Sequence, residues 1–432
     1  MKRILYVVPA LLALFSAHAH GQESMPMAGM ENSVGTFSSG TSIEPLTTSE
    51  TSSMIHTTLG KWEFMFHANA VLVDTQQSGP RGFDKLFSTN WAMPMFGRTF
   101  GKNTVQIRTM FSLEPLTVTH RRYPLLFQTG EAAFGRAIVD GQHPHDLIME
   151  LTGKYGHAFS EKTQFFVYGG PVGEPALGPT AFPHRASASE NPLAVLSHHY
   201  QDSTHLANNV ITLGFVQGPV QLEASTFHGG EPDENRWNID KGSPDSFASR
   251  LTIAGAKTLT GQFSIGRLNN REPSEPGMDT LRTTASLHHH KRFSGGHIAS
   301  SLIWGRNKDI DDGEERVFNS YTLESTVNFG KNWTWTRIEN VDRDASLLAG
   351  EVSGHVDETP IGRVQAWTIG YERELPVGSA PIRLGLGAQV SLYGMPDALT
   401  PIYGDRPSGV AFFLRLRPKG NMMLHMQGMH QH

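Results

Sequence analysis

The sequence predicts an all-β protein, a closed antiparallel transmembrane β-barrel of about sixteen strands, with fourteen as the alternative. Two observations carry this prediction. Apolar and polar residues alternate in one segment after another, and short connections rich in turn formers alternate with long polar connections. Successive side chains of a strand point to opposite faces, so each segment has one apolar and one polar face. This regular asymmetry of connections is typical of bacterial outer-membrane barrels.

The first nineteen residues have the features of a signal peptide. Lys2 and Arg3 form a basic start, residues 4–15 are apolar, and residues 17–19 fit the small-x-small cleavage rule. No later run of about eighteen apolar residues predicts a spanning helix. We therefore expect export to the bacterial outer membrane. We expect residues 20–59 to form a flexible periplasmic leader that contains Met, because Gly, Ser and Thr there bury little apolar surface.

The barrel is expected over residues 60–418, and the alternation is clearest at 382–392, where Ile382, Leu384 and Leu386 share one parity. The expected strands are 61–73, 86–96, 103–115, 147–158, 163–169, 208–217, 220–228, 246–259, 261–269, 281–293, 297–306, 316–330, 332–343, 364–375, 382–394 and 408–418.

The connections between these strands fall into two kinds. The short ones are predicted as periplasmic turns, and the long ones as extracellular loops. The expected long loops are 119–146, 170–207, 229–245, 270–280, 307–315, 344–363 and 395–407. We expect the loops 119–146 and 170–207 to fold over or into the mouth of the barrel.

The two faces of the strands are expected to meet lipid and water. Aromatic residues of the apolar parity near strand ends predict a girdle at the membrane interface, among them Trp333, Trp335, Trp367, Tyr371 and Phe412. The other parity carries charges that only a wet lumen accommodates, and it includes Arg108, Glu223, Arg250, Arg282, Glu324 and Arg415.

Composition excludes several classes of site and partner. Cysteine is absent, which excludes disulfides, thiolate metal sites and cysteine nucleophiles. Removal of Lys2 and Arg3 would change the formal net charge from −5 to −7, so nucleic acid is not an expected partner. The expected partners are outer-membrane lipid and a metal ion or small solute.

Methionine and histidine gather near the end of the chain, in a predicted periplasmic tail over residues 419–432. Thioether sulfur with imidazole suits Cu(I), and imidazole alone extends the range to Cu(II) or Zn(II). A disordered tail without a metal is the alternative, and a periplasmic partner is a further possibility. The candidate ligands are Met422, Met423, His425, Met426, Met429, His430 and His432.

A second candidate metal site precedes the fourth expected strand. Pro144 favours an extended conformation at His143, so His143 and His145 would share one face beside Asp146. Two imidazoles and a carboxylate suit a divalent metal. The alternative is that these imidazoles hydrogen-bond to carboxylates of the barrel wall.

The loop 170–207 offers three further candidates. Asn191 and Pro192 are typical of a helix start, and a helix beyond them would place His198, Asp202 and His205 on one face. These three residues and the His143 group would form a joint metal site. Packing of polar residues inside the barrel is the alternative.

Catalysis is not expected. Asp202, Ser203 and His205 suggest a hydrolase, but no Gly-x-Ser-x-Gly motif is present and residues so close in sequence rarely form a triad.

The segments at 142–147, 169–176 and 198–205, which read QHPHDL, GGPVGEPA and HHYQDSTH, resemble a group of proteobacterial and acidobacterial exported proteins, and this resemblance implies an outer-membrane barrel. The Met/His tail is similar to those of outer-membrane proteins of the copper-resistance B type, although long Met-His-Gly repeats are absent. This second resemblance implies binding or transport of copper or another heavy metal. A general solute porin with a loop-constricted lumen is the alternative, and an outer-membrane hydrolase is a third.

Overall fold

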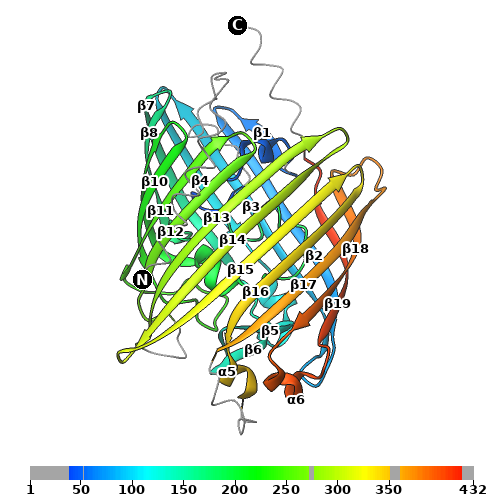
Figure 1. The fold of residues 1–432 in the computed structure, drawn as a ribbon. Coiled ribbons are helices and arrows are strands. Elements are labelled where there is room, and N and C mark those ends of the chain that lie inside the picture. The colour runs from blue at the N-terminus through cyan, green and yellow to red at the C-terminus, as the bar shows by residue number, and fades with distance from the viewer. Residues whose placement is uncertain (1–37, 52, 272–276, 351–360, 421–432) are drawn as a thin grey trace.

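The protein forms one barrel in a computed structural model (Figure 1). The structure describes residues 38–51, 53–271, 277–350 and 361–420. Sixteen strands form a ring in which each strand is antiparallel to the next, and β1 is an additional short strand beside β2. The ring closes where β19 pairs with β2, from Gly409 opposite Gln77 to Leu416 opposite Ala70. The prediction of a closed antiparallel barrel of sixteen strands is confirmed.

The strands of the ring are β2 (Trp62–Gln77), β3 (Asp84–Phe100), β4 (Asn103–Phe111), β7 (Ile148–Ser160), β8 (Thr163–Gly173), β9 (Ala207–Gln217), β10 (Val220–His228), β11 (Ser246–Ala256), β12 (Leu259–Leu268), β13 (Asp279–Phe293), β14 (Gly296–Asp311), β15 (Glu314–Phe329), β16 (Asn332–Asp344), β17 (Ile361–Leu375), β18 (Ile382–Gly394) and β19 (Ser408–Pro418). The other elements are β1 (Ile55–Leu59), β5 (Tyr123–Ala133), β6 (Arg136–Gln142), α3 (Glu114–Thr117), α4 (His198–Gln201), α5 (Ala345–Ala349), α6 (Thr400–Tyr403), and the 3-10 helices η2 (Leu46–Glu50), η3 (Thr119–Arg121), η4 (Ser203–His205) and η6 (Asp397–Leu399). No helix among the described residues is long and apolar enough to cross a membrane.

All sixteen expected strands are present, but two connections differ from the prediction. The expected loop 307–315 is largely strand, because β14 and β15 continue to a tight turn at Asp312 and Gly313, whose φ angles of 44° and 87° are positive. The expected loop 119–146 contains the β5–β6 hairpin, which lies at the same end of the barrel as α5 and α6 (Figure 1).

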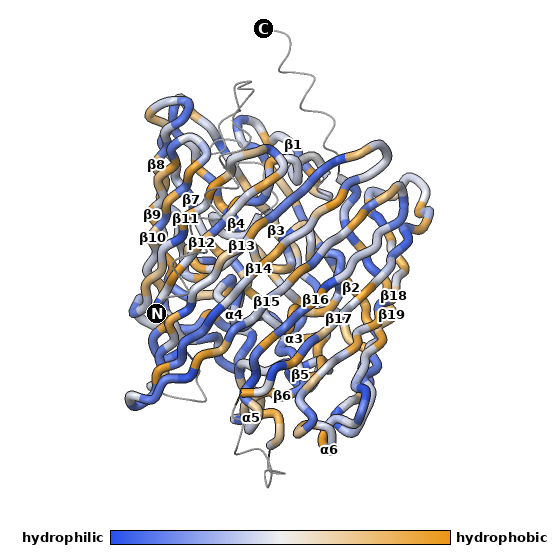
Figure 2. Tube along the Cα trace, viewed as in Figure 1, coloured by the Kyte–Doolittle hydropathy of each residue, from blue (hydrophilic) through white to orange (hydrophobic). Residues whose placement is uncertain are grey.

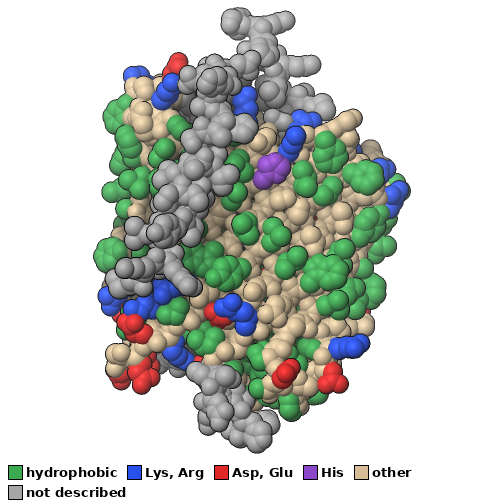
Figure 3. All heavy atoms as spheres, viewed as in Figure 1, with side chains coloured by type: hydrophobic (Ala, Val, Ile, Leu, Met, Phe, Trp, Pro, Cys, Tyr) green, Lys and Arg blue, Asp and Glu red, His purple; other side chains and the backbone are tan. Residues whose placement is uncertain are grey.

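The outer face of the wall is apolar. Hydropathy alternates along the strands in Figure 2, and hydrophobic side chains cover the visible wall in Figure 3, while most charged side chains lie toward the two ends. The girdle residues Trp367, Tyr371 and Phe412 are exposed on this face, as predicted. The prediction is wrong for Trp333 and Trp335, which are buried in the lumen because they share the parity of Arg337 and Glu339.

The inner face carries the predicted charges, and they are almost completely buried. Arg250 and Glu223 on adjacent strands pair through Nε and Oε2 at 2.9 Å, and both side chains are 0% exposed. Arg415 pairs with Glu372 in the same way, through Nε and Oε2 at 2.8 Å. Side chains that line an open aqueous channel would remain exposed, so the lumen of this barrel is filled.

Part of the filling is the segment predicted as a flexible leader. Residues 20–37 and residue 52 lie outside the described residues, but residues 38–45 are buried within the barrel. Arg108 donates to the carbonyl oxygen of Gly40 at 2.7 Å, and Arg250 donates to Thr41 Oγ1 at 2.9 Å. The leader prediction is therefore wrong for residues 38–51 and 53–59, the described part of this segment. Small residues expose backbone carbonyl and hydroxyl groups that can form hydrogen bonds with the buried charged side chains of the lumen. Bulky apolar residues would leave those charged groups without partners.

We expect a charge on the outer face to destabilise the barrel according to its depth. Leu323 is exposed near the middle of β15, and Leu86 is exposed near one end of β3. Leu323→Arg should lower the free energy of unfolding by about 2–4 kcal/mol, and Leu86→Arg by about 0–1 kcal/mol, because charge is costlier at the bilayer midplane. Denaturant titration in lipid vesicles measures both. Equal losses for the two variants would contradict a wall embedded in lipid.

Candidate metal centre

The loop that carries most of the candidate ligands lies inside the barrel. Nearly all residues from 174 to 206 are buried. Arg185 anchors the loop: its Nε lies 2.5 Å from Glu324 Oε1 on β15, and its Nη1 lies 2.8 Å from Asp202 Oδ2 within the loop. Arg337 donates to the other oxygen of Glu324 at 3.1 Å. A buried charge requires such partners, so these ion pairs fix the loop against the wall.

The helix in this loop is shorter than predicted. It does not start at Asn191, and only His198–Gln201 are α-helical, followed by the 3-10 turn Ser203–His205. The expected relation between His198 and Asp202 is nevertheless present: His198 Nδ1 lies 2.7 Å from Asp202 Oδ1. The two short helices place His198, His199 and His205 close together.

Three imidazoles define the centre. One ring nitrogen from each of His143, His198 and His199 lies within 4.8 Å of the others, and all three residues are buried. The ring centroids of His198 and His199 are 5.0 Å apart, and those of His143 and His199 are 5.6 Å apart. His143 follows β6, so two segments far apart in the sequence supply the three rings. We call this group the trihistidine centre.

The Nδ1 atom of each ring faces an acceptor. His198 Nδ1 faces Asp202, His199 Nδ1 lies 3.4 Å from Glu231 Oε1, and His143 Nδ1 lies 3.1 Å from the carbonyl oxygen of Pro144. Metal-binding histidines almost always donate their second ring nitrogen to a carboxylate or a carbonyl. This arrangement favours the tautomer that leaves Nε2 of His198 and His199 available to a metal ion, whereas Nε2 of His143 also contacts Glu131.

Two of the three imidazoles, His198 and His199, are buried in a way that favours their neutral form. Burial lowers the pKa of His199 to about 4, against the opposing charge of Glu231, and burial also lowers the pKa of His198. Neutral imidazole is the form that coordinates a metal. His199 Nε2 is buried and has no hydrogen-bond partner among the described residues, as expected of an atom reserved for a ligand.

Gly130 on β5 allows His199 to occupy this position. Its φ angle is 124°, and a Cβ atom built on Gly130 would lie 2.5 Å from Nε2 of His199. Any side chain there would displace the imidazole. The β5–β6 hairpin therefore provides the space that His199 needs, and the residue directly after it is His143.

The predicted carboxylate ligands have other roles. Asp146 Oδ1 lies 3.1 Å from Arg236 Nη1, and Asp202 holds His198 and Arg185. Although burial opposes it, the hydrogen bond from His198 and the charge of Arg185 lower the pKa of Asp202 below its ordinary value. A further carboxylate, that of Glu131, contacts the centre, because its Oε1 lies 2.9 Å from His143 Nε2.

His143 and His145 point to different partners, so the prediction that they act together from one face is wrong. His145 Nδ1 lies 3.0 Å from Glu114 Oε2, and its ring centroid is 5.5 Å from that of His205. His205 also lies beside the trihistidine centre, 5.1 Å from the ring centroid of His198. Both His143 and His145 contact carboxylates, as the alternative proposed, but these belong to β5 and α3 and not to the wall.

The sequence did not single out His199, although it is adjacent to His198. Neighbouring residues of a helix point about 100° apart, which argues against their sharing one site. In the structure both reach the centre because His143 approaches from a separate segment. The two consecutive histidines, His198 and His199, are the feature of the sequence that could have indicated His199 as a site residue. The tail ligands from Met422 to His432 lie outside the described residues, so the structure does not bear on them.

Comparison with known proteins adds information about the fold. No family model and no curated protein sequence matches this chain. An anion-selective porin from Comamonas acidovorans is 13% identical, with a TM-score of 0.51, over 82% of this chain and 99% of the porin. OmpF of Salmonella typhi, in a complex with daunomycin, is 8% identical, with a TM-score of 0.49, over 84% of this chain and 100% of OmpF. The chain thus shares the barrel fold of the Comamonas porin.

We expect the lumen loop to depend on Asp202. Asp202→Ala should lower the free energy of unfolding by about 3–5 kcal/mol, because it leaves the buried Arg185 charge without one of its partners. Asp405→Ala removes an exposed carboxylate and serves as the control, with a change within about 0.5 kcal/mol. Denaturant titration in detergent micelles compares the two. Similar values would contradict the anchoring role of the ion pair.

Proposed function

We propose that this protein is an outer-membrane barrel that binds a divalent transition-metal ion, Cu(II) or Zn(II), at the trihistidine centre, in the handling of heavy metals. The single observation that carries the proposal is the arrangement of His143, His198 and His199, with each Nδ1 held by an acceptor and the rings converging. Three imidazoles with an open fourth position are a known zinc ligand set, and imidazole also suits copper.

The membrane assignment is supported by the two faces of the wall. Large apolar side chains are exposed on the outside of strand after strand, among them Leu323, Ile338, Ile369 and Leu414. Contiguous apolar surface of this extent is costly in water and favourable in lipid. A barrel with short turns at one end and long loops at the other is the form found in bacterial outer membranes.

The filled lumen argues against a general solute porin. Loop residues 174–206, residues 38–51 and the β5–β6 hairpin share the interior with paired charges of the wall. A small ion held by protein ligands fits such an interior better than a freely diffusing solute does. The hydrolase alternative has little support, because the Ser203 hydroxyl is bonded to Glu231 Oε1 at 3.3 Å and to Arg282 Nη1 at 2.9 Å. Neither of these two partners is a histidine that could activate the hydroxyl.

Replacement of the three rings should remove one metal ion per chain. We expect the wild-type protein to bind Zn(II) or Cu(II) at this centre, and the triple variant His143→Ala, His198→Ala and His199→Ala to bind one ion fewer. Isothermal titration in detergent measures the stoichiometry. The control is His289→Ala, because His289 faces the outside of β13 and does not belong to the trihistidine centre. Residues 421–432 are the same in all variants, so any ions that they bind contribute equally to each stoichiometry and do not affect the difference. Equal stoichiometry in wild type and triple variant would overturn the proposal.

The same proposal predicts low conductance. In planar bilayers we expect the full chain to conduct far less than a sixteen-stranded porin of open lumen, because the paired charges and the loop 174–206 fill the interior. Single-channel recording in symmetric KCl measures this. The Arg185→Ala variant, which loses the loop anchor, should open more often. Stable porin-sized openings in the wild type would favour the solute-porin alternative.

A further inference from the structure

Methionine is concentrated in one part of the barrel interior. The described residues contain eight methionines, and all but Met278 and Met395 belong to one buried cluster. The members of this methionine cluster are Met54, Met65, Met93, Met95, Met110 and Met149, together with Trp91, Val172 and Leu206.

Packing alone does not account for this concentration. Methionine fills irregular gaps, so as a packing residue it would be spread among the cores. The largest core cluster has 20 buried residues, all of them Val, Leu, Ala, Phe, Tyr or Trp. Five of the six methionines instead lie on β2, β3, β4 and β7, which are consecutive strands of the ring, and Met54 directly precedes β1.

Strand register brings thioethers and an imidazole onto one face. Met65 on β2 is directly opposite Met95 on β3, and His67 is directly opposite Met93. All four side chains are buried in the lumen. Directly opposite residues have Cβ atoms about 4.5–5.5 Å apart, which is within reach of a shared ligand for long side chains.

A second imidazole enters from the loop that fills the lumen. His184 Nε2 lies 3.4 Å from Met110 Sδ on β4, and the ring centroids of His184 and His67 are 6.1 Å apart. For zinc with imidazole and thiolate ligands, bonds of about 2.0 and 2.3 Å place nitrogen and sulfur roughly 3.5 Å apart at a tetrahedral angle. The observed separation matches that value.

The charges near the cluster are already balanced. Arg108, opposite Met95 on β4, pairs with Glu150 at 3.2 Å and donates to the carbonyl oxygens of Ser38 and Gly40. The other ligand atoms named for the cluster are thioether sulfurs and imidazole nitrogens, which carry no negative charge. Such a soft, neutral set favours a monovalent soft ion over a hard divalent one.

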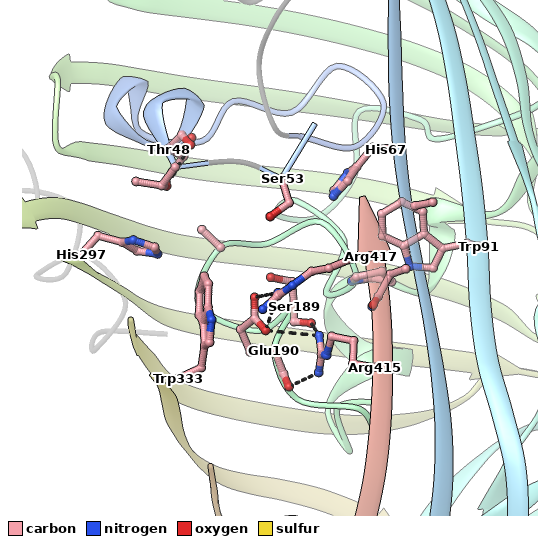
Figure 4. A pocket seen from close by; sticks show the side chains of 15 residues that line it. Thr48, Ser53, His67, Trp91, Ser189, Glu190, His297, Trp333, Arg415 and Arg417 are labelled. Carbon is pink, nitrogen blue, oxygen red and sulfur yellow. Dashed lines mark hydrogen bonds and ion pairs between the residues drawn. The ribbon is translucent and has the colours of Figure 1, made fainter. Parts of the chain in front are cut away.

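A cavity of about 50 Å³ lies beside the cluster, and Trp91 belongs to both. Its lining includes His67, Trp91 and Pro183, the residue before His184 (Figure 4). On its other side the buried Glu190 is paired with Arg415 and Arg417. An ion in this cavity would meet His67 at the edge of the methionine cluster.

We propose that the methionine cluster binds one Cu(I) or Ag(I) ion, through Met110 and His184 with Met93 and His67 beside them. The site uses none of the residues of the trihistidine centre, so it stands or falls independently of the function proposed above.

Silver serves as the probe because it does not change oxidation state under these conditions. The full chain in detergent is titrated with silver nitrate in chloride-free buffer and compared with Met93→Leu/Met110→Leu, which keeps the volume of the core nearly unchanged. We expect the double variant to bind one Ag(I) fewer, or to bind it at least about tenfold more weakly. Met278→Leu/Met395→Leu is the matched control, and the trihistidine variant should retain this ion. Equal stoichiometry and affinity in wild type and Met93→Leu/Met110→Leu would overturn the proposal.

A measurement on the wild type covers the case in which the double variant does not fold. With methionine labelled at the methyl carbon, Ag(I) should shift the NMR signals of Met93 and Met110 and leave those of Met278 and Met395 in place. If the cluster signals do not move when Ag(I) is in excess, the cluster is packing only.

Discussion

The structure depends on the neutralisation of charge inside a closed wall. A buried ion without a partner costs several kcal/mol, so each charge that the strands turn inward needs a partner in the interior. The chain provides these partners from its own loops: Arg185 bridges Glu324 of the wall and Asp202 of the loop, and Glu190 receives Arg415 and Arg417. The interior is therefore a folded polar core and not a water-filled lumen.

The position of the trihistidine centre follows from this constraint. Asp202 holds Arg185 with one oxygen and His198 with the other, so the ion pair that anchors the loop also orients a metal-binding ring. Arg236 has a similar double role, since it pairs with both Asp146 and Glu131, and Glu131 contacts His143. The ion pairs that stabilise the fold therefore also hold the histidine rings of the centre in position.

The wall was predictable from the sequence and the interior was predictable only in part. Alternation with period two depends on each strand alone, which is why all sixteen strands were found and why Arg250 and Arg282 were assigned to the lumen. The girdle prediction is wrong for Trp333 and Trp335 because they share the parity of Arg337, which places all three side chains in the lumen. Residues 38–51 were misread because their low apolar content suggested disorder, whereas their partners, Arg108 and Arg250, are distant in the sequence. His199 was overlooked for the same reason, since the ring that completes the site belongs to another loop.

The most direct test of a metal centre inside this barrel is anomalous diffraction from crystals grown with Zn(II). We predict one peak inside the barrel, within about 2.0–2.1 Å of Nε2 of His143, His198 and His199. A structure in which zinc is bound elsewhere, while these three rings keep their places without an ion between them, would contradict the account.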